Sequence, residues 1–393
     1  MSVASTRCFT RGSGAFLFDE CERPLFDAIS SVWTTTHGHC EPRIVERIAA
    51  QAATLDHATL LGATNPLAEA LAEKLAALSG LQYAFFASDG ASAIEAALKM
   101  TLQYWQNVGK PDRTRFVKLS NAYHGDTAAA MSVSDIALFK ERFGPLTFEV
   151  RSYDDFRESF AAGADDLAGI IVEPTVQAAA GMRIVDAAAY AGLASREALL
   201  IVDEIATGFG RTGTMFAFEQ LDLRPDIVCV GKGLTGGALA LSATLTSAAV
   251  YDAFCGEYGE FRHFFHGHSY AGNPIACAAA LASLEIFEDE GFARVDELAA
   301  SMREALSTLA ALPAVREIRQ VGVMAGIELE PTLLRSGAAY SPGWAVANEL
   351  FAGGFFTRPI GNVVQLVPPY CSMPRDIRGF VDATASALHA WRI

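Results

Sequence analysis

Three uninterrupted apolar runs constrain the fold of this chain more than any other feature. They are Leu167–Val172, Leu199–Val202 and Ile227–Val230, and longer mixed segments with the pattern of helices alternate with them. Strands this continuously apolar are typical of a largely parallel sheet that is buried on both faces. We therefore predict an α/β fold in which a ligand binds at the carboxyl ends of these strands.

The segments before this sheet predict helices and a turn. From Pro42, apolar residues that include Ile44 and Ile48 recur at helical spacing. Further on, a short aromatic strand leads into a turn that contains Gly90, and a second helix follows and ends at Gly109.

The length of 393 residues is enough for a large domain and a smaller companion. We predict an N-terminal segment over 1–45, a large domain over 46–284 and a small α+β domain over 285–393. The small domain holds an amphipathic helix, short strands and a final helix from Pro374. Two short strands, in "GAFLFDE" and "PLFDAISS", are expected to pack with it.

Composition narrows the classes of partner. A formal net charge of −15 repels nucleic acid and anionic membranes, and no stretch is apolar enough for a spanning helix. No secretory segment opens the chain. The seven cysteines are an odd number without any Cys-x-x-Cys, which favours reduced thiols. We expect a cytoplasmic protein that binds neither nucleic acid nor membrane.

Two charged residues, Asp203 and Lys232, stand at the ends of two of the apolar runs. Each has an ordinary interpretation, since Lys232 could be a structural lysine and Asp203 a helix cap or an arginine partner. A Gly-Leu-Thr-Gly-Gly stretch after Lys232 would let a ligand approach the backbone. Pyridoxal phosphate explains both residues, because it needs a Schiff-base amine and a carboxylate that keeps its ring nitrogen protonated.

Two further stretches suit the phosphate and the ring of such a cofactor. In "SDGASAIE" (88–95) a helix start offers backbone N–H groups to an anion, although Ser92 and Glu95 also fit an ordinary capping box. In "NAYHGDTAAAMSV" (121–133) Tyr123 could cover a flat ring or could pack in the core.

Several long motifs, added to these residues, resemble the class III, fold-type I aminotransferases that depend on pyridoxal phosphate. They include "DAISSVWTTTHGH", "VDEIATGFGRTG", "GKGLTGGALALSATLT", "HGHSYAGNPIACAAALASL" and "TRPIGNVVQLVPPY". The resemblance implies a large domain with a mostly parallel sheet between helices, and a smaller α+β domain. It also implies ping-pong transfer of an amino group from a small-molecule amine donor to a keto acceptor.

The resemblance assigns cofactor roles residue by residue. Lys232 is the expected Schiff-base lysine, Asp203 the partner of the pyridine nitrogen, and Tyr123 the side chain that stacks on the ring. The other expected cofactor contacts are Gly90 and Ala91 through their amides, Glu173, His268, and Ser269, which would reach the phosphate in the neighbouring subunit. The resemblance therefore implies a homodimer with shared active sites.

For substrates, the resemblance points to Trp33 and Tyr123 as pocket walls, Gly267 beside the donor, and Arg358 as the partner of a substrate carboxylate. Within class III it is strongest to the branch that uses S-adenosylmethionine as donor and 8-amino-7-oxononanoate as acceptor, in biotin biosynthesis.

Two alternatives stay open, a related ω- or natural-product aminotransferase with another donor or carboxylate-bearing acceptor, and an inactive relative that serves as a binding module. The sequence departs from this branch in three places. Its first tyrosine is Tyr83, although the branch usually has one in the N-terminal segment. The stretch "VQAAAG" replaces a more glycine-rich one, and Ala91 stands where serine is common.

Three histidines, His263, His266 and His268, lie close together in the sequence and raise the question of a metal site. No other ligand-rich motif accompanies them, and zinc sites join ligands at defined spacing. We expect no metal.

Overall fold

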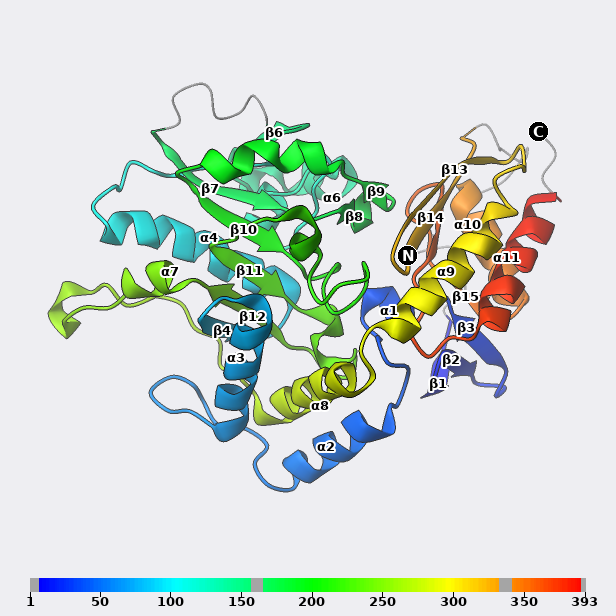
Figure 1. Ribbon diagram of the computed structural model, residues 1–393, viewed down its shortest axis with the longest axis horizontal. Helices are drawn as coiled ribbons and strands as arrows, with labels where there is room; N and C mark the ends of the chain where they lie inside the picture. Colours follow the sequence, from blue (N-terminus) through cyan, green and yellow to red (C-terminus); the bar gives the residue numbers. More distant parts are fainter. Residues whose placement is uncertain (1–6, 157–164, 332–340, 390–393) are drawn as a thin grey trace.

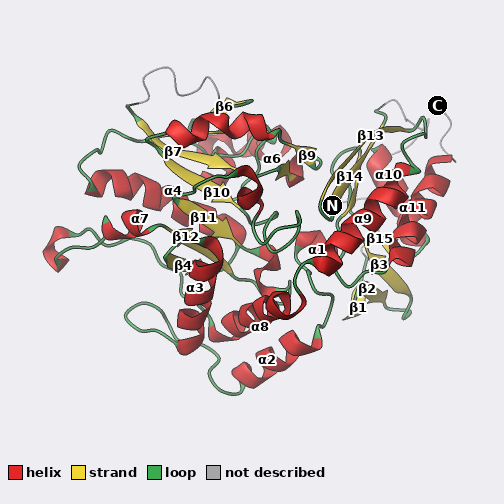
Figure 2. Ribbon diagram, in the orientation of Figure 1, coloured by secondary structure: helices red, strands yellow, loops and turns green. Residues whose placement is uncertain are grey.

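The computed structural model describes residues 7–156, 165–331 and 341–389. Its larger body is built on a seven-stranded sheet, in which only β12 runs antiparallel to its neighbours. The strand order is β4 (Tyr83–Ala87), β12 (Ser242–Thr246), β11 (Ile227–Val230), β10 (Leu199–Asp203), β7 (Leu167–Val172), β5 (Arg115–Leu119) and β6 (Arg151–Tyr153). The predicted α/β fold with a mostly parallel sheet is confirmed, and Figure 2 shows this sheet among helices.

The central strands are buried on both faces, as their composition predicts. Ile171 and Ile201 face helix α4 (Gly90–Asn107) and belong to its core cluster. Their neighbours Ile170 and Leu200 face the opposite side and join a larger core, which continues into the C-terminal part of the chain. All four of these side chains are fully buried.

The connections between these strands differ from the expected α-helices. Residues Ala187–Ser195 and Ala217–Leu221 form 3₁₀ helices, η3 and η4. Their backbone groups bond outside the local segment, since Ala189 accepts from Phe156 N–H and Phe218 N–H donates to the Glu204 carboxylate. These external partners take the place of a continuous i to i+4 ladder.

The smaller body contains two small sheets and three helices, at the right of Figure 1. One sheet joins β13 (Val315–Val321), β14 (Met324–Leu329) and β16 (Val363–Leu366), and the other joins β1 (Phe9–Ser13), β2 (Phe16–Asp19), β3 (Pro24–Asp27) and β15 (Phe355–Phe356). The helices are α9 (Ala293–Ser307), α10 (Pro342–Ala352) and α11 (Pro374–His389). Because β3 pairs in parallel with β15, the N-terminal strands lie in this body.

The remaining elements surround the large sheet or connect the two bodies. They are α1 (Ser30–Trp33), α2 (Pro42–Ala52), α3 (Pro66–Ser79), α5 (Ala128–Ser132), α6 (Ala137–Lys140), α7 (Ala248–Asp252), α8 (Pro274–Glu290), β8 (Val176–Gln177), β9 (Arg183–Ile184), η1 (Glu141–Leu146), η2 (Ala178–Ala180), η5 (Lys232–Thr235) and η6 (Tyr258–Glu260). Both predicted domain boundaries fall inside helices that pack on each other, α2 and α8.

Two general features bear on the environment of the protein. No described helix is both long enough and apolar enough to span a bilayer. All seven cysteines lie in the described ranges, and all of them are free thiols.

Candidate active site

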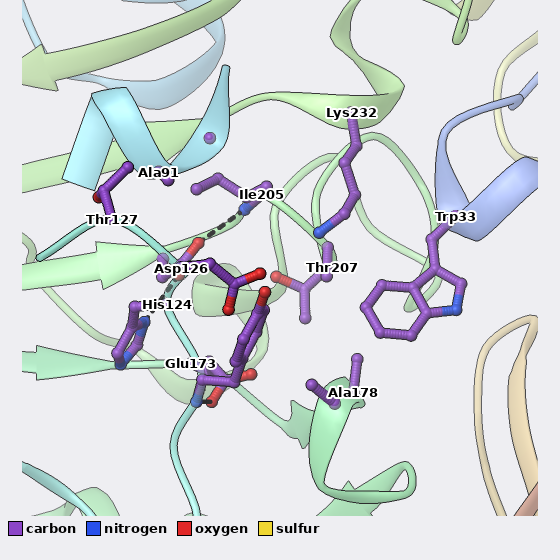
Figure 3. Close-up of a pocket in the computed structure, with 16 residues that line it drawn as sticks. Trp33, Ala91, His124, Asp126, Thr127, Glu173, Ala178, Ile205, Thr207 and Lys232 are labelled. Atoms are coloured by element: carbon purple, nitrogen blue, oxygen red, sulfur yellow. Dashed lines mark hydrogen bonds and ion pairs between the residues drawn. The ribbon is translucent and has the colours of Figure 1, made fainter. Parts of the chain in front are cut away.

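A cavity of about 390 Å³ lies at the carboxyl ends of the parallel strands (Figure 3). Asp203 ends β10, Glu173 follows β7, and Lys232 follows β11. Tyr123 lies in the loop after β5, and Gly90 opens α4 after β4. Residues at or just after the ends of five strands, which are far apart in sequence, thus meet at one cavity. Ligand sites of parallel sheets commonly lie at this edge.

Asp203 is held by a histidine. His124 Nδ1 donates to Asp203 Oδ2 at 2.7 Å, and the N–H of Ile205 donates to Oδ1 at 3.0 Å. Both side chains are buried. Because a carboxylate only accepts, His124 carries its hydrogen on Nδ1, and its buried Nε2 has no partner among the described residues. Among the described residues Asp203 pairs with His124 and with the N–H of Ile205, and no arginine forms an ion pair with it.

Lys232 holds its amine in the same cavity on a strained backbone. Its φ of 40° lies in the left-handed region, which is rare for residues other than glycine and is often found at functional sites. Burial lowers the pKa of the amine, Asp203 and Glu173 oppose this effect, and the Arg211 guanidinium adds to it. The net pKa is lowered, so the amine loses its proton more readily than an exposed lysine.

The glycines after Lys232 have a packing role. A Cβ on Gly237 would lie 2.7 Å from backbone atoms of Thr34 and Thr35, and one on Gly236 would lie 2.5 Å from Ile44 Cδ1. The absence of side chains at these two positions therefore admits the N-terminal segment.

Glu173 and Tyr123 form one wall of the cavity. The N–H of Tyr123 donates to Glu173 Oε2 at 3.0 Å. Burial and then the charge of Asp203 raise the pKa of Glu173 well above its usual value. Burial, followed by the charge of Asp126 and a hydrogen bond to it, raises the pKa of the Tyr123 phenol. Both groups therefore hold their protons at higher pH than usual.

The start of α4 has the properties of an anion site. Asp89 is its N-cap, since Oδ1 accepts from the N–H of Ser92 at 3.0 Å and its carbonyl from that of Ala93. The N–H groups of Gly90 and Ala91, in the first turn, have no hydrogen-bond partner in the described ranges. Such free amides at a helix start favour a bound anion.

The capping box considered for Ser92 and Glu95 is wrong. Glu95 instead accepts from the N–H of Ala129 at 2.8 Å and so ties α4 to the start of α5.

A second cavity, of about 250 Å³, adjoins the first and shares Trp33, Tyr123 and Lys232 with it. Arg358 lines it and has no ion-pair partner within the described part of the chain. The Nζ atom of Lys232 lies 5.0 Å from the centroid of the Trp33 indole ring. Figure 3 shows both side chains at the same cavity. The structure thus brings together the predicted cofactor lysine and two predicted substrate residues.

Three predicted residues lie outside both cavities of this chain. Gly267 packs against Leu61, and His268 and Ser269 follow it on an exposed segment. Nearby, His266 Nε2 lies 3.2 Å from His268 Nε2. Among the residues with described positions, no group of three or more His, Cys, Asp or Glu side chains could hold a metal.

Several residues of the site carried no role in the sequence-based prediction. Thr207 lines the cavity and donates to Glu204 Oε2 at 2.5 Å, His124 holds Asp203, and Gln365 lines the second cavity. A buried carboxylate such as that of Asp203 needs a hydrogen-bond donor. This requirement is the one signal in the sequence that could have pointed to His124, which is next to Tyr123.

Comparison with known proteins identifies the family. Residues 1–388 match the family described as aminotransferase class III. The adenosylmethionine-8-amino-7-oxononanoate aminotransferase of Aquifex aeolicus is 40% identical over 97% of this chain and 91% of its own. The crystal structure of the Methanocaldococcus jannaschii protein of that name covers 99% of this chain and 94% of its own, with a TM-score of 0.92 and 36% identity.

A second solved structure belongs to a relative with a different name. The amine transaminase from an uncultivated Pseudomonas species, solved in its PLP-bound form, is 30% identical and covers 100% of this chain and 98% of its own, with a TM-score of 0.91. Because the family match spans nearly all of the sequence and the relatives align over nearly their whole length, this chain belongs to the class III aminotransferases, which are pyridoxal-phosphate-dependent transaminases.

Proposed function

We propose that this enzyme transfers an amino group from S-adenosylmethionine to 8-amino-7-oxononanoate and so forms 7,8-diaminononanoate for biotin biosynthesis. The observation that carries the proposal is the similarity to two proteins named adenosylmethionine-8-amino-7-oxononanoate aminotransferase. The Aquifex aeolicus protein is 40% identical to this chain and the Methanocaldococcus jannaschii protein is 36% identical, and each alignment covers more than 90% of both chains. The guanidinium of Arg358 lines the second cavity and forms no ion pair with the residues whose positions are described, which supports a substrate with a carboxylate.

The residues of the first cavity fit the cofactor. Asp203 would face the ring nitrogen, and His124 would keep its carboxylate oriented. The free amides of Gly90 and Ala91 would hold the phosphate, and the amine of Lys232 lies within the same cavity. Bound pyridoxal phosphate supplies the electron sink that acidifies the carbon next to the donor nitrogen.

Lys232 carries out the proton transfers. With pyridoxal phosphate bound, its amine would hold the cofactor before substrate binds, and once a donor amine has taken its place Nζ would be free to remove a proton from the donor carbon. Its lowered pKa favours the neutral amine that this task needs. Return of the proton would also fall to Nζ. The same roles would apply in reverse when the acceptor binds, which predicts ping-pong kinetics.

Aromatic and cationic groups orient the substrates. Trp33 and Tyr123 line both cavities together with Lys232. Arg358 presents a planar fork of donors to the carboxylate of the acceptor.

We propose a homodimer in which His268 and Ser269 complete the cofactor site of the partner and Gly267 lies beside its donor. The exposed apolar residues near these positions support this arrangement. Tyr270 is 65% exposed and Leu61, which contacts Gly267, is 67% exposed. Large apolar side chains exposed together are typical of surfaces covered by another protein.

We further propose the division at 1–45, 46–284 and 285–393, and a cytoplasmic location, which the seven free thiols support.

A related ω- or natural-product transaminase is the second candidate. The observation in its favour is the amine transaminase that matches the full length of this chain at 30% identity. In addition, residues 1–82 contain no tyrosine, which is a departure from the biotin-pathway branch.

The test is a half-reaction. The purified protein, loaded with pyridoxal phosphate, is mixed with S-adenosylmethionine alone, and the absorbance of the bound cofactor is followed. Conversion of the cofactor to its amino form is expected. Conversion by alanine, lysine or glutamate but not by S-adenosylmethionine would refute the proposed donor and favour the second candidate. No conversion by any amine would favour the inactive relative.

A further inference from the structure

Gln365 connects two parts of the wall of the second cavity, the side chain of Trp33 and the loop that carries Arg358. The indole Nε1–H of Trp33 donates to Gln365 Oε1 at 2.9 Å, and Gln365 Nε2 donates to the backbone carbonyl of Arg358. Gln365 is only 2% exposed and lies in β16, while Trp33 belongs to the N-terminal segment, 332 positions away. One side chain therefore connects the aromatic wall to the loop that carries Arg358.

The chemistry of the two partners leaves the amide one orientation. An indole N–H can only donate, so it must face the amide oxygen. A backbone carbonyl can only accept, so it must face the amide nitrogen. A side chain without both functions satisfies at most one of the two buried partners.

The backbone that carries Trp33 needs such support. All four residues of α1, from Ser30 to Trp33, have φ between 47° and 67°, so α1 is a left-handed turn. None of them is glycine, and each costs an L-residue roughly 1–2 kcal/mol in this conformation. Contacts from elsewhere must hold it, and one is the bond from Ser30 Oγ to the Val367 carbonyl at 2.7 Å, just after β16.

The indole also lies beside the reactive amine, since Lys232 Nζ is over the ring and 5.0 Å from its centroid. Gln365 also fixes the loop through its own carbonyl, which accepts from Thr357 Oγ1 at 2.8 Å. Lys232, Trp33, Gln365 and the Arg358 loop therefore form one continuous series of contacts.

We propose that Gln365 is a positioning residue that couples Trp33 to the Arg358 loop and so fixes the distance between the reacting amine and the carboxylate-binding guanidinium. The inference rests on the proposed function, because Arg358 is taken to bind the acceptor carboxylate. Gln365 does not itself react. It selects acceptors whose carbonyl and carboxylate match this fixed spacing.

A double-mutant cycle tests the coupling. Gln365→Met keeps the volume but removes both bonds, and Trp33→Phe keeps an aromatic wall but removes the N–H. Each change should lower kcat/KM for 8-amino-7-oxononanoate about tenfold, mostly through KM, and the double variant should be little worse than Gln365→Met alone. Gln320→Met is the matched control, because its amide donates to the carbonyls of Ala299 and Gly322 away from both cavities. It should leave KM unchanged.

A second measurement needs no substrate. In protein labelled with ¹⁵N-tryptophan, the four tryptophans give four indole signals, and Trp33→Phe identifies the one that belongs to Trp33. Gln365→Met should move that signal upfield as its hydrogen bond is lost, while the other three stay in place. Gln320→Met should move none of them.

The outcomes separate the two proposals. Losses that multiply in the double variant, or a Trp33 signal unchanged by Gln365→Met, would overturn the coupling. If the wild-type enzyme does not use S-adenosylmethionine, only the proposed donor is refuted. The double-mutant cycle would then be measured with the carboxylate-bearing amine that the enzyme does use. Collapse of all four signals in Gln365→Met would mean that Gln365 supports the fold as a whole, which also overturns the proposal.

Discussion

At Gly125 a single added methyl group should weaken binding of the cofactor by more than its effect on the stability of the fold explains. It lies in the loop after β5 with a φ of 128°. A Cβ there would lie 2.7 Å from Ala91 Cβ, 3.2 Å from Ala91 Cα and 3.3 Å from Ala130 Cβ. Carbon atoms in contact are normally about 3.5–4.0 Å apart, so Gly125→Ala must push the loop or the start of α4 by about 1 Å.

The displaced groups are the ones that we expect to hold the phosphate. A hydrogen bond from an amide to a charged group contributes roughly 1.5–3 kcal/mol. Losing one of the two bonds from Gly90 and Ala91 should therefore weaken binding of pyridoxal phosphate roughly 10- to 100-fold.

Gly80→Ala is the matched control. Gly80 ends α3 with a φ of 73°, and a Cβ there would meet nothing within 4 Å. Both variants carry the cost of about 1–2 kcal/mol for a left-handed L-residue, but only Gly125→Ala disturbs the phosphate site. Spectrophotometric titration of the apoproteins with pyridoxal phosphate measures the difference. Equal affinities in the two variants would refute the assignment of the phosphate to this turn.

Three more changes follow from the site. Burial raises the pKa of Glu204 to about 7 from 4.5, so the folded protein keeps this proton when the unfolded chain has lost it, and stability falls as pH rises between those values. Glu204→Gln should therefore be more stable than wild type at pH 8, by up to about 3 kcal/mol, and the gain should shrink toward pH 5. Urea unfolding of the apoproteins measures it, and a gain independent of pH would contradict the assignment. Arg358→Met should raise KM for 8-amino-7-oxononanoate roughly 10- to 100-fold without changing cofactor affinity, and an unchanged KM would remove Arg358 from carboxylate binding. Lys232→Ala should still bind cofactor but lose turnover roughly 10²- to 10⁴-fold in single-turnover absorbance measurements, and substantial remaining turnover would remove Lys232 from its role.

The sheet and its edge could be predicted because their signals are local. A strand buried on both faces must be apolar along its length, as in Leu199–Val202. The polar residue that ends such a strand, here Asp203, must then lie at the edge where ligands bind. Motifs as long as "VDEIATGFGRTG" added the chemistry of the site through resemblance.

The partners of these residues could not be predicted, because distant segments supply them. The bond between His124 and Asp203 spans 79 positions, and nothing around either residue specifies the other. The left-handed turn before Trp33 runs against the local preference of its four residues, so only tertiary contacts can maintain it. The glycines at 236 and 237 indicated a flexible ligand loop, yet their lack of side chains admits the segment around Thr35.

The sequence by itself determined the α/β fold and the edge of the sheet that holds the cavity, and through resemblance it predicted the residues to which we assign the chemistry. Apolar runs and long motifs are read along the chain, and they need no knowledge of what packs against them. Only the tertiary structure decided what holds those residues in place, with His124 on Asp203, Gln365 on Trp33, and Gly125 against Ala91. Such contacts depend on the directions of side chains from elements far apart in sequence, and folding alone brings those elements together.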